Sequence, residues 1–331
     1  EDINFLSRLA GSGPLLVLTA NRVKSLQRSL RQGWPAATIA LATRHYEQIF
    51  DLAFGQTRLG DDDGFSLVAE RSGSLADHAT RLLRNAKLLP AALMARLPFR
   101  DIAAQDRFAQ EHNILVLEAR DLESYHHQAG AMMRIAARAR VPLAVAEDAE
   151  VVMFRAEIGG EDHFAVLIGK GADLAAPLVR LHSQCITGDV LGSLKCDCGD
   201  QLQAAMRLMA ENGGGVLIYL AQEGRDIGLL NKMRAYALQD NGLDTVDANH
   251  ALGFDTDERV FLPAARILDA LGIARLRLIT NNPDKISQLE QCGIKVEERV
   301  PLTLASNPHN EDYLATKKHR TGHMITDKDN R

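Results

Sequence analysis

Ala176–Cys185 reads Ala-Pro-Leu-Val-Arg-Leu-His-Ser-Gln-Cys, and Cys196–Gly199 reads Cys-Asp-Cys-Gly. The apolar half of the first stretch predicts a buried strand that runs into Cys185. Three of the chain's four cysteines are therefore clustered, in the spacing Cys-x10-Cys-x-Cys. Structural zinc sites use four protein ligands, whereas catalytic sites use three and leave the fourth position to water. We interpret Cys185, Cys196 and Cys198 as an open metal site suited to hydrolytic chemistry.

Two other arrangements of these cysteines remain as alternatives. A disulfide would leave one of the three sulfurs unpaired, and Cys-x-Cys is too short a loop to bridge without strain. A closed Cys3His site would recruit His182, which precedes Cys185 by an odd number of residues. Such a separation on a strand points two side chains to opposite faces, which makes His182 the poorer ligand. The open site is favoured, and Cys292, near the end of an expected helix, is interpreted as a buried thiol.

The size and composition indicate a soluble enzyme of two domains. A chain of 331 residues exceeds one ordinary domain. Its net charge of −5 gives no field that would attract nucleic acid or an anionic membrane, and no apolar run reaches the roughly 20 residues of a membrane span. Clustered cysteines suit a reducing compartment, so we expect a cytoplasmic protein. The chain starts at Glu1 without a methionine, and we expect the natural protein to begin earlier.

Residues 1–148 are expected to form an N-terminal α/β domain without a recognisable catalytic motif. Apolar runs predict strands at residues 14–19, 37–41, 65–69 and 113–117, and helical spacing covers residues 23–31, 45–54, 74–97 and 124–140. The acidic run Asp61-Asp62-Asp63 is explained by a surface turn. His126 and His127 diverge on a helix, so we do not expect them to share a metal ion.

Residues 149–325 are expected to form the second domain, and residues 326–331 a frayed tail. The apolar runs 151–156 and 163–168 flank a glycine-containing turn, which predicts a β-hairpin. Further strands are expected at 215–220 and 276–280, and helices at 200–211, 229–240 and 260–271. The whole chain is thus expected to be a two-domain α/β (α+β) protein.

Two strand-to-helix junctions in this domain carry charged and glycine residues. In Gln222-Glu223-Gly224-Arg225, the guanidinium could clamp a phosphate and the carboxylate could hold a hydroxyl group or Mg²⁺. Thr280–Lys285 reads Thr-Asn-Asn-Pro-Asp-Lys, and its helix N-terminus would attract an anion. The plainer interpretations are a helix-entry turn at the first junction and an ordinary capped helix at the second.

Two further segments, Arg234–Asp240 and Gly253–Arg259, lie between these junctions. Either segment could be a solvated face. Alternatively, a tyrosine and an aspartate from them could act as proton-transfer partners beside a metal-activated water.

These motifs carry a family resemblance. From about residue 154 to residue 324 the chain resembles GTP cyclohydrolase II, which opens the riboflavin pathway. The matching motifs are Arg-x-His-Ser-x-Cys-x-Thr-Gly-Asp, Cys-Asp-Cys-Gly, Gln-Glu-Gly-Arg, Arg-Ala-Tyr-Ala-Leu-Gln-Asp, Asp-Glu-Arg, Thr-Asn-Asn-Pro and the closing Tyr313–His323 segment. Several independent motifs over about half of the chain make a chance match untenable.

The resemblance implies zinc-dependent hydrolysis of GTP. One zinc ion on Cys185, Cys196 and Cys198 would direct water to C8 of guanine, releasing formate, and pyrophosphate would also leave. The product would be a diamino-ribosylamino-pyrimidinone phosphate, with Mg²⁺ accompanying the triphosphate. The C-terminal domain would have a mixed sheet with flanking helices, in a homodimeric protein. The implied substrate-binding residues are Arg180, Leu181, His182, Ser183, Gln184, Gln201, Glu223, Gly224, Arg225, Thr245, Thr280 and Lys285.

The resemblance also implies three catalytic residues: Tyr236 beside the reacting ring, and Asp257 with Arg259 at the α-phosphate. Family members are usually assigned a nucleophilic arginine at the position of Arg259. Since an arginine side chain stays protonated in proteins, we expect a cationic Arg259 that stabilises the transferring phosphoryl group.

The chain departs from the family pattern in two places. Gln184 stands where a glutamate usually precedes the first cysteine, which removes a negative charge beside the metal. This change keeps open a relative that acts on another nucleotide, or a non-catalytic zinc protein that binds nucleotides. The N-terminal region lacks the acidic signature of the 3,4-dihydroxy-2-butanone 4-phosphate synthases that are often fused to this family. We interpret it as at most a degenerate relative of them.

Overall fold

The computed structural model describes residues 2–10, 13–41, 47–55, 64–129, 132–157, 160–302, 304, 307–310, 320 and 324. The predictions for residues 61–63, 311–319, 321–323 and 326–331 lie outside these residues. The chain forms two compact units. We call Glu1–Tyr125 with Met233–Asp257 the N-terminal unit, and His126–Lys232 with Glu258–Arg331 the C-terminal unit. Within the described ranges, no helix is both long and apolar enough to cross a membrane.

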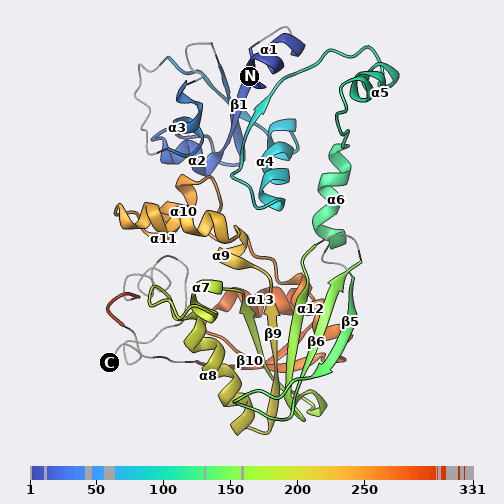
Figure 1. Ribbon diagram of the computed structural model, residues 1–331, viewed down its shortest axis with the longest axis vertical. Helices are drawn as coiled ribbons and strands as arrows, with labels where there is room; N and C mark the ends of the chain where they lie inside the picture. Colours follow the sequence, from blue (N-terminus) through green and yellow to red (C-terminus); the bar gives the residue numbers. More distant parts are fainter. Residues whose placement is uncertain are drawn as a thin grey trace. The chain divides into compact units, whose positions relative to one another are not determined.

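A four-stranded antiparallel sheet organises the N-terminal unit (Figure 1). Its order is β3 (Leu67–Glu70), β2 (Ala36–Ala40), β1 (Leu15–Thr19) and β4 (Ala91–Met94). The helices in this part of the chain are α1 (Asp2–Ala10), α2 (Ala20–Ser25), α3 (Ile49–Phe54), α4 (Leu75–Asn85), α5 (Ile102–Glu111) and α6 (Ala119–Ala129). Alternate side chains of β1 enter a core that also includes Val23 and Leu52.

A distant part of the sequence, Met233–Asp257, completes this unit. It includes most of α10 (Leu229–Asp240) and all of α11 (Thr245–Ala251), which packs against α2. The Thr19 hydroxyl donates to the Gly253 carbonyl at 2.7 Å. Gly253 has φ +88°, and a Cβ there would lie 3.0 Å from Pro90. The turn after α11 therefore needs a glycine, for conformation and for space.

The buried side chain of Arg22 joins two segments of this unit by hydrogen bonds. Its side chain is almost fully buried, and its guanidinium donates to the carbonyls of Asp51, Leu52 and Gly55, and to that of Ala251 at 2.8 Å. Burial lowers the pKa of Arg22 to about 10, an effect that Asp51 opposes. One side chain thereby joins the C-terminal ends of α3 and α11.

Three predictions for this region are wrong. Residues 113–117 form no strand, and Leu115 is 94% exposed. The helix predicted at 74–97 ends with α4 at Asn85, and β4 follows because Ala91–Met94 pairs with β1. The helix predicted at 124–140 ends with α6, and Met133–Arg140 forms strand β5. Both missed strands are rich in alanine, a strong helix former, so strand pairing overrides local propensity.

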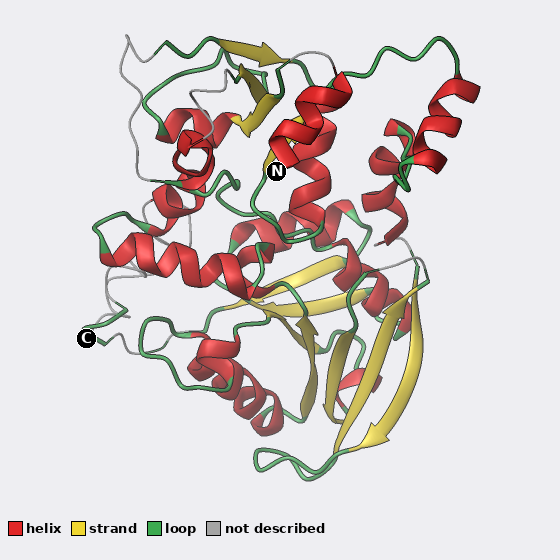
Figure 2. Ribbon diagram, turned by 45° about the horizontal axis from the view of Figure 1, so that its top comes forward, coloured by secondary structure: helices red, strands yellow, loops and turns green. Residues whose placement is uncertain are grey.

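A seven-stranded mixed sheet forms the C-terminal unit (Figures 1 and 2). Its order is β11 (Lys295–Val300), β10 (Arg275–Ile279), β8 (Leu178–Ser183), β9 (Gly214–Leu220), β7 (His163–Gly169), β6 (Ala149–Ala156) and β5. Strands β11, β10, β8 and β9 are parallel, and the other three are antiparallel. The predicted hairpin is confirmed, with Phe154 opposite His163. The sheet matches the expected α/β (α+β) class.

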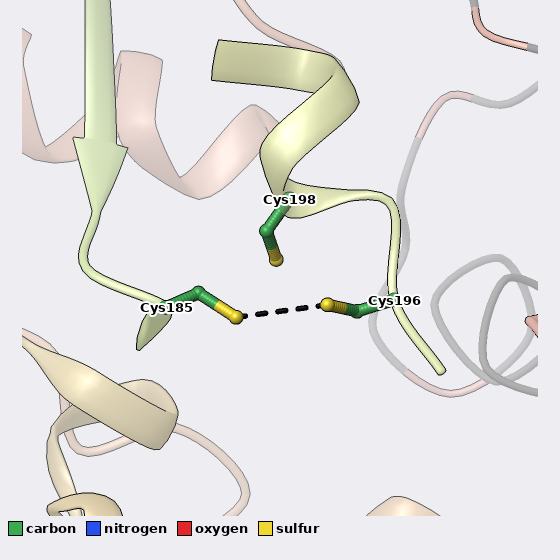
Figure 3. A group of neighbouring side chains, drawn as sticks. All are labelled: Cys185, Cys196 and Cys198. Atoms are coloured by element: carbon green, nitrogen blue, oxygen red, sulfur yellow. Dashed lines mark hydrogen bonds between the residues drawn. The ribbon is translucent and has the colours of Figure 1, made fainter. Parts of the chain in front are cut away.

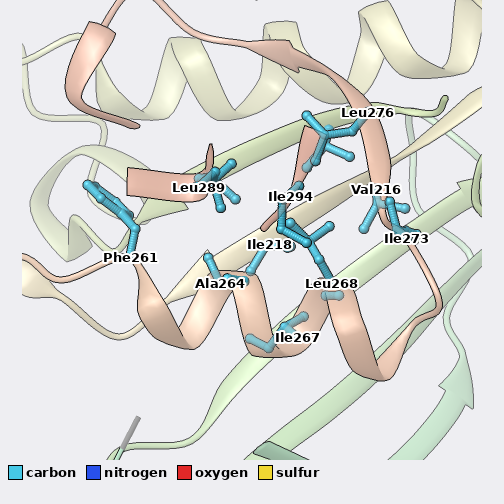
Figure 4. Close-up of a cluster of buried hydrophobic side chains, with 14 of the residues drawn as sticks. Val216, Ile218, Phe261, Ala264, Ile267, Leu268, Ile273, Leu276, Leu289 and Ile294 are labelled. Carbon is cyan, nitrogen blue, oxygen red and sulfur yellow. The ribbon is translucent and has the colours of Figure 1, made fainter. Parts of the chain in front are cut away.

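Helices cover both faces of this sheet. Along β9, Val216, Ile218 and Leu220 face a core that includes α12 (Leu262–Ala270) and α13 (Pro283–Gln291). Figure 4 shows Val216 and Ile218 in this core. Leu217 faces the opposite core, with residues of α8 (Cys198–Glu211). Burial on both faces explains why β9 is a continuous apolar run.

The compact units differ from the predicted boundary at residues 148 and 149. That boundary falls between β5 and β6, which pair along their length from Met133↔Ala156 to Arg140↔Glu150. The sheet of the C-terminal unit therefore begins at Met133. The other difference is Met233–Asp257, which belongs to the N-terminal unit.

Candidate active site

The candidate site lies at the carboxyl ends of three adjacent parallel strands. Gln184 and Cys185 follow β8, Gln222–Arg225 follows β9, and Thr280–Lys285 follows β10. Loops at this edge of a parallel sheet converge, and it is where open α/β sheets bind ligands. The order β10-β8-β9 thus brings together segments that are far apart in the sequence.

Three thiols converge at this edge (Figure 3). Their sulfur atoms lie within 4.8 Å of one another, and Cys185 Sγ is 3.6 Å from Cys196 Sγ. Cys185 precedes α7 (Ile186–Asp189), and Cys198 is the first residue of α8.

A glycine leaves room for this cluster. A Cβ on Gly188 would lie 2.8 Å from the sulfur of Cys196 and 3.2 Å from that of Cys185. The space beside the sulfurs is therefore open only because residue 188 has no side chain. Three soft, convergent thiolates fit a zinc ion with one position left for water or substrate.

His182 points to a different partner. Its Nε2 lies 3.0 Å from Asp189 Oδ1, and both side chains are only 3% exposed. Asp189 also accepts from the backbone N–H of Cys185 at 2.9 Å and from the Tyr219 hydroxyl at 2.8 Å. Burial lowers the pKa of His182, against the opposing effect of Asp189. Asp189 therefore fixes the Cys185 backbone and the orientation of His182 together.

Sequence motifs alone do not reveal the supporting roles of Asp189 and Tyr219. Asp189 is the last residue of the Arg-x-His-Ser-x-Cys-x-Thr-Gly-Asp motif, but nothing in the local pattern indicates its contact with the Cys185 backbone. Tyr219 lies on β9 directly opposite His182, and only strand pairing reveals that contact.

Lys232 is a third supporting side chain that sequence motifs alone do not reveal. Its Nζ lies 3.1 Å from Cys185 Sγ and 2.8 Å from Glu223 Oε1. Glu223 Oε2 in turn accepts from the backbone N–H of Ile186 at 2.7 Å. Hydrogen bonds with Cys196 and Cys198, and then the Lys232 ammonium, lower the pKa of Cys185. The Cys185 thiolate raises the pKa of Cys196 to about 11.

A pocket beside the cysteines is rich in cations. It is lined by Arg180, His182, Ser183, Cys198, Gln201, Arg225, Arg259, Thr280, Asn281, Asn282 and Lys285. Among these described residues there are arginines and a lysine but no carboxylate. Guanidinium and ammonium groups are the usual protein partners of phosphate. The lining therefore suits an anionic ligand, and Cys198 connects it to the thiol cluster.

Arg180 has a donor to spare in this pocket. Its side chain donates to the Ile279 carbonyl at 3.0 Å and to Gln201 Oε1 at 2.5 Å. Its buried Nε has no hydrogen-bond partner among the described residues. Burial also lowers the pKa of Arg180. An anionic ligand would offset both the unmet donor and the desolvation of the charge.

The turn after β9 is conformationally costly. Gly224, Arg225 and Asp226 all have positive φ, at 65°, 62° and 74°. For residues other than glycine, this conformation costs of order 1–3 kcal/mol each and persists only where the surroundings enforce it. In this strained turn, Arg225 contributes to the pocket lining.

Two of the other cations, those of Arg259 and Lys285, lie over the ring of Phe261. The Arg259 guanidinium lies 5.5 Å and the Lys285 ammonium 5.4 Å from the centre of its buried ring. Lys285 also donates to the Leu181 carbonyl at 2.8 Å, and Arg259 donates to Ser183 Oγ at 3.3 Å. These contacts fix both positive charges on the pocket wall.

The other predicted site residues lie outside this lining. Leu181 is buried in the core, and Glu223 is engaged by Lys232 and Ile186. Neither Gln184 nor Gly224 belongs to the pocket lining. The remaining three predicted residues, Tyr236, Thr245 and Asp257, belong to the N-terminal unit.

Comparisons with known proteins show which family the chain resembles. The sequence model of the GTP cyclohydrolase II family matches residues 133–301. A GTP cyclohydrolase-2 from Azospirillum brasilense is 45% identical over 98% of this chain and 85% of its own length. The riboflavin biosynthesis protein RibBA of Salinispora tropica is 42% identical over 78% of this chain and 66% of its own length.

A solved structure resembles the chain more distantly. It is RibBX, a two-domain 3,4-dihydroxy-2-butanone 4-phosphate synthase from A. baumannii. It covers 91% of this chain and 88% of its own, at 18% identity and a TM-score of 0.32. The match to the family and the similarity to the full-length relative establish that this chain belongs to the GTP cyclohydrolase II family of hydrolases.

Proposed function

We propose that this protein is a zinc-dependent hydrolase that opens the imidazole ring of GTP and releases formate and pyrophosphate, in the first step of riboflavin synthesis. The observation that carries this proposal is the cluster of Cys185, Cys196 and Cys198 beside a cation-lined pocket. Ring opening needs an activated water, and a triphosphate needs positive charge. In our proposal the cysteine cluster would supply the activated water through its metal ion, and the pocket would supply the positive charge.

The cysteines would hold the metal. Zinc bound to three thiolates would supply a Lewis acid that activates water for attack on C8 of the guanine. The residues around the cluster have supporting tasks. Asp189 holds the backbone of Cys185 in place, and the absence of a Cβ at Gly188 keeps the space beside the sulfurs open.

The pocket cations would hold the triphosphate, and Mg²⁺ would accompany its phosphates. Arg180 offers its unpaired Nε, while Arg225, Arg259 and Lys285 add further positive charge. The N-terminus of α13, which Asn282 caps, adds backbone dipoles at the same edge. In our proposal Arg259 stays cationic and stabilises the phosphoryl transfer that frees pyrophosphate.

Tyr236 and Asp257 are proposed to act as proton-transfer partners, in line with the family motifs that contain them. Thr245, His182, Ser183, Gln201 and Thr280 are proposed to contact the nucleotide. For Glu223, we propose a supporting role instead of a direct contact, because both carboxylate oxygens already accept hydrogen bonds within the protein.

The test is formate release from GTP by the zinc-loaded full chain with Mg²⁺, together with the ultraviolet spectrum of the product. Cys196→Ser is the metal-site control, because two thiolates hold zinc too weakly. Formate release by that variant at full zinc occupancy would contradict the assignment of the ligands. GTP binding without formate would favour a non-catalytic nucleotide-binding protein, and formate from another purine nucleotide alone would favour a different substrate.

We also propose that the protein is a homodimer and that it is cytoplasmic. Light scattering of the purified chain tests the first, and fractionation of cells tests the second.

A further inference from the structure

We propose that Lys232, held in place by Glu223, is a positioning residue that donates a hydrogen bond to the sulfur of Cys185 and so tunes how strongly that ligand donates electrons to the metal. The inference rests on the proposed function only in taking the cysteines to bind a divalent ion. It assigns a role to two buried charges that line no part of the described pocket.

The ammonium is saturated by its surroundings. A lysine side chain has three N–H donors. Lys232 Nζ has acceptors at 3.1 Å on Cys185 Sγ, 2.8 Å on Thr187 Oγ1 and 2.8 Å on Glu223 Oε1. The side chain is 9% exposed. Its charge is therefore directed at the cysteine segment.

Glu223 holds both partners of this contact. One carboxylate oxygen accepts from Lys232, and the other accepts from Ile186 N, the residue that follows Cys185. The neighbouring Gly224 makes room, since a Cβ there would lie 3.1 Å from Lys232 Cβ. The carboxylate therefore fixes the ammonium relative to the backbone beside the sulfur.

A buried ion pair of this kind needs a reason beyond stability. Removing two charges from water costs more than their attraction commonly returns. The third contact of the ammonium, with a sulfur, supplies such a reason. Three thiolates would place a net negative charge on a divalent metal site. A hydrogen bond to one sulfur withdraws part of that charge, which makes the bound ion a stronger Lewis acid.

The experiment uses the full chain loaded with Co²⁺ in place of zinc, because thiolate-to-cobalt charge-transfer bands report the sulfur electrons directly. Lys232→Met keeps a side chain of similar length but removes the hydrogen bond to the sulfur. The sulfur should then donate electrons more readily, so the band should move to longer wavelength. Lys285→Met is the matched control. It removes another buried lysine of the same unit, one whose recorded hydrogen bond goes to the Leu181 carbonyl.

Glu223→Gln provides a second variant with the opposite sign. The amide oxygen can still accept from Ile186, while the ammonium loses the Glu223 carboxylate and keeps its contact with the Cys185 sulfur. The hydrogen bond to sulfur should strengthen, and the band should move to shorter wavelength. With zinc and GTP, Lys232→Met should lower kcat by roughly 10- to 100-fold with little change in KM, whereas Lys285→Met should raise KM.

A cobalt band that stays at the wild-type wavelength in folded, loaded Lys232→Met overturns the inference, as does an equal shift in Lys285→Met. If Lys232→Met does not fold, the Glu223→Gln spectrum decides, and an unshifted band overturns it. These outcomes are separate from the proposed reaction. If the cobalt band shifts in Lys232→Met but the wild-type protein releases no formate, the proposed function alone is refuted.

Discussion

The two units supply the predicted site residues in different ways. In the C-terminal unit, Cys185, Arg225 and Lys285 follow three adjacent strands, so one sheet positions these parts of the site. Tyr236, Thr245 and Asp257 instead lie on a segment that departs after Lys232 and returns at Glu258, and that packs into the N-terminal unit. The difference shows that residues 1–125, which carry no catalytic motif, can still shape a segment that carries family motifs.

The reason is that Met233–Asp257 depends on residues 1–125 for its burial. Phe254 is fully buried, and Val246 and Leu252 are 3% exposed. The hydroxyl of Thr19 and the guanidinium of Arg22 bind the backbone carbonyls at the end of α11. Without residues 1–125, these apolar side chains and carbonyls would face water.

The largest effect should come from deleting residues 1–125. We expect a fragment that begins at His126 to keep the cysteine cluster, because the seven-stranded sheet stays whole. We expect its formate release to fall to background, because Met233–Asp257 loses its packing. Cobalt loading tests the first point, and the GTP assay tests the second. Wild-type turnover by a folded fragment would show that the segment orders itself without the N-terminal unit.

A smaller loss is expected at Arg259, the second residue after the chain returns to the C-terminal unit. Arg259→Met should lower kcat by roughly 10²–10³-fold, the range for removing one electrostatic donor. Arg259→Lys should retain part of the activity, because the charge survives while the fork geometry is lost. A covalent phosphoguanosyl adduct isolated on Arg259 would contradict this electrostatic role.

A smaller effect is expected from removing one hydrogen bond between residues 1–125 and Met233–Asp257, and two threonines allow a matched comparison. Thr19→Val removes the hydrogen bond to Gly253, whereas Thr38→Val removes one to Glu70 within the same sheet. Each should cost about 1 kcal/mol of unfolding free energy. Only Thr19→Val should speed hydrogen exchange in residues 245–255. Equal exchange in the two variants would mean that this bond does not hold the segment.

The smallest effect concerns pH. Burial lowers the pKa of His182 below its ordinary value of 6.5. Below that pH the unfolded chain takes up a proton that the folded chain resists, so stability should fall with pH, by at most about 1.4 kcal/mol per pH unit. His182→Gln should lower stability at neutral pH but flatten this slope. Denaturant midpoints between pH 7.5 and pH 5.5, at matched metal loading, measure it. An unchanged slope would assign the effect elsewhere.

The sequence predicted most where local patterns dominate. The hairpin of β6 and β7 follows from two apolar runs and a turn, and α10 has the predicted bounds. The cysteine cluster follows from its spacing. Alanine-rich β4 and β5 were missed, because only their pairing partners make them strands.

Long-range contacts account for the rest. Lys232 reads as one residue of a helix, and only the fold brings its ammonium to Cys185. Nothing in the local pattern of Met233–Asp257 reveals which unit it joins, because that depends on surfaces far away in the sequence. Supporting contacts of this kind follow from tertiary structure more than from motifs.

The contacts of Arg22 bear on how such a protein can be recombined. Its guanidinium binds carbonyls from residues 51–55 and also from Ala251, so residues 1–125 cannot be exchanged independently of residues 233–257. In a chimaera that took only residues 1–125 from a relative, the residue at position 22 and its surroundings would come from the relative, whereas α11 would be native. To transfer the unit whole, a designer must carry residues 233–257 with it, and must therefore graft two separate pieces of the gene at once.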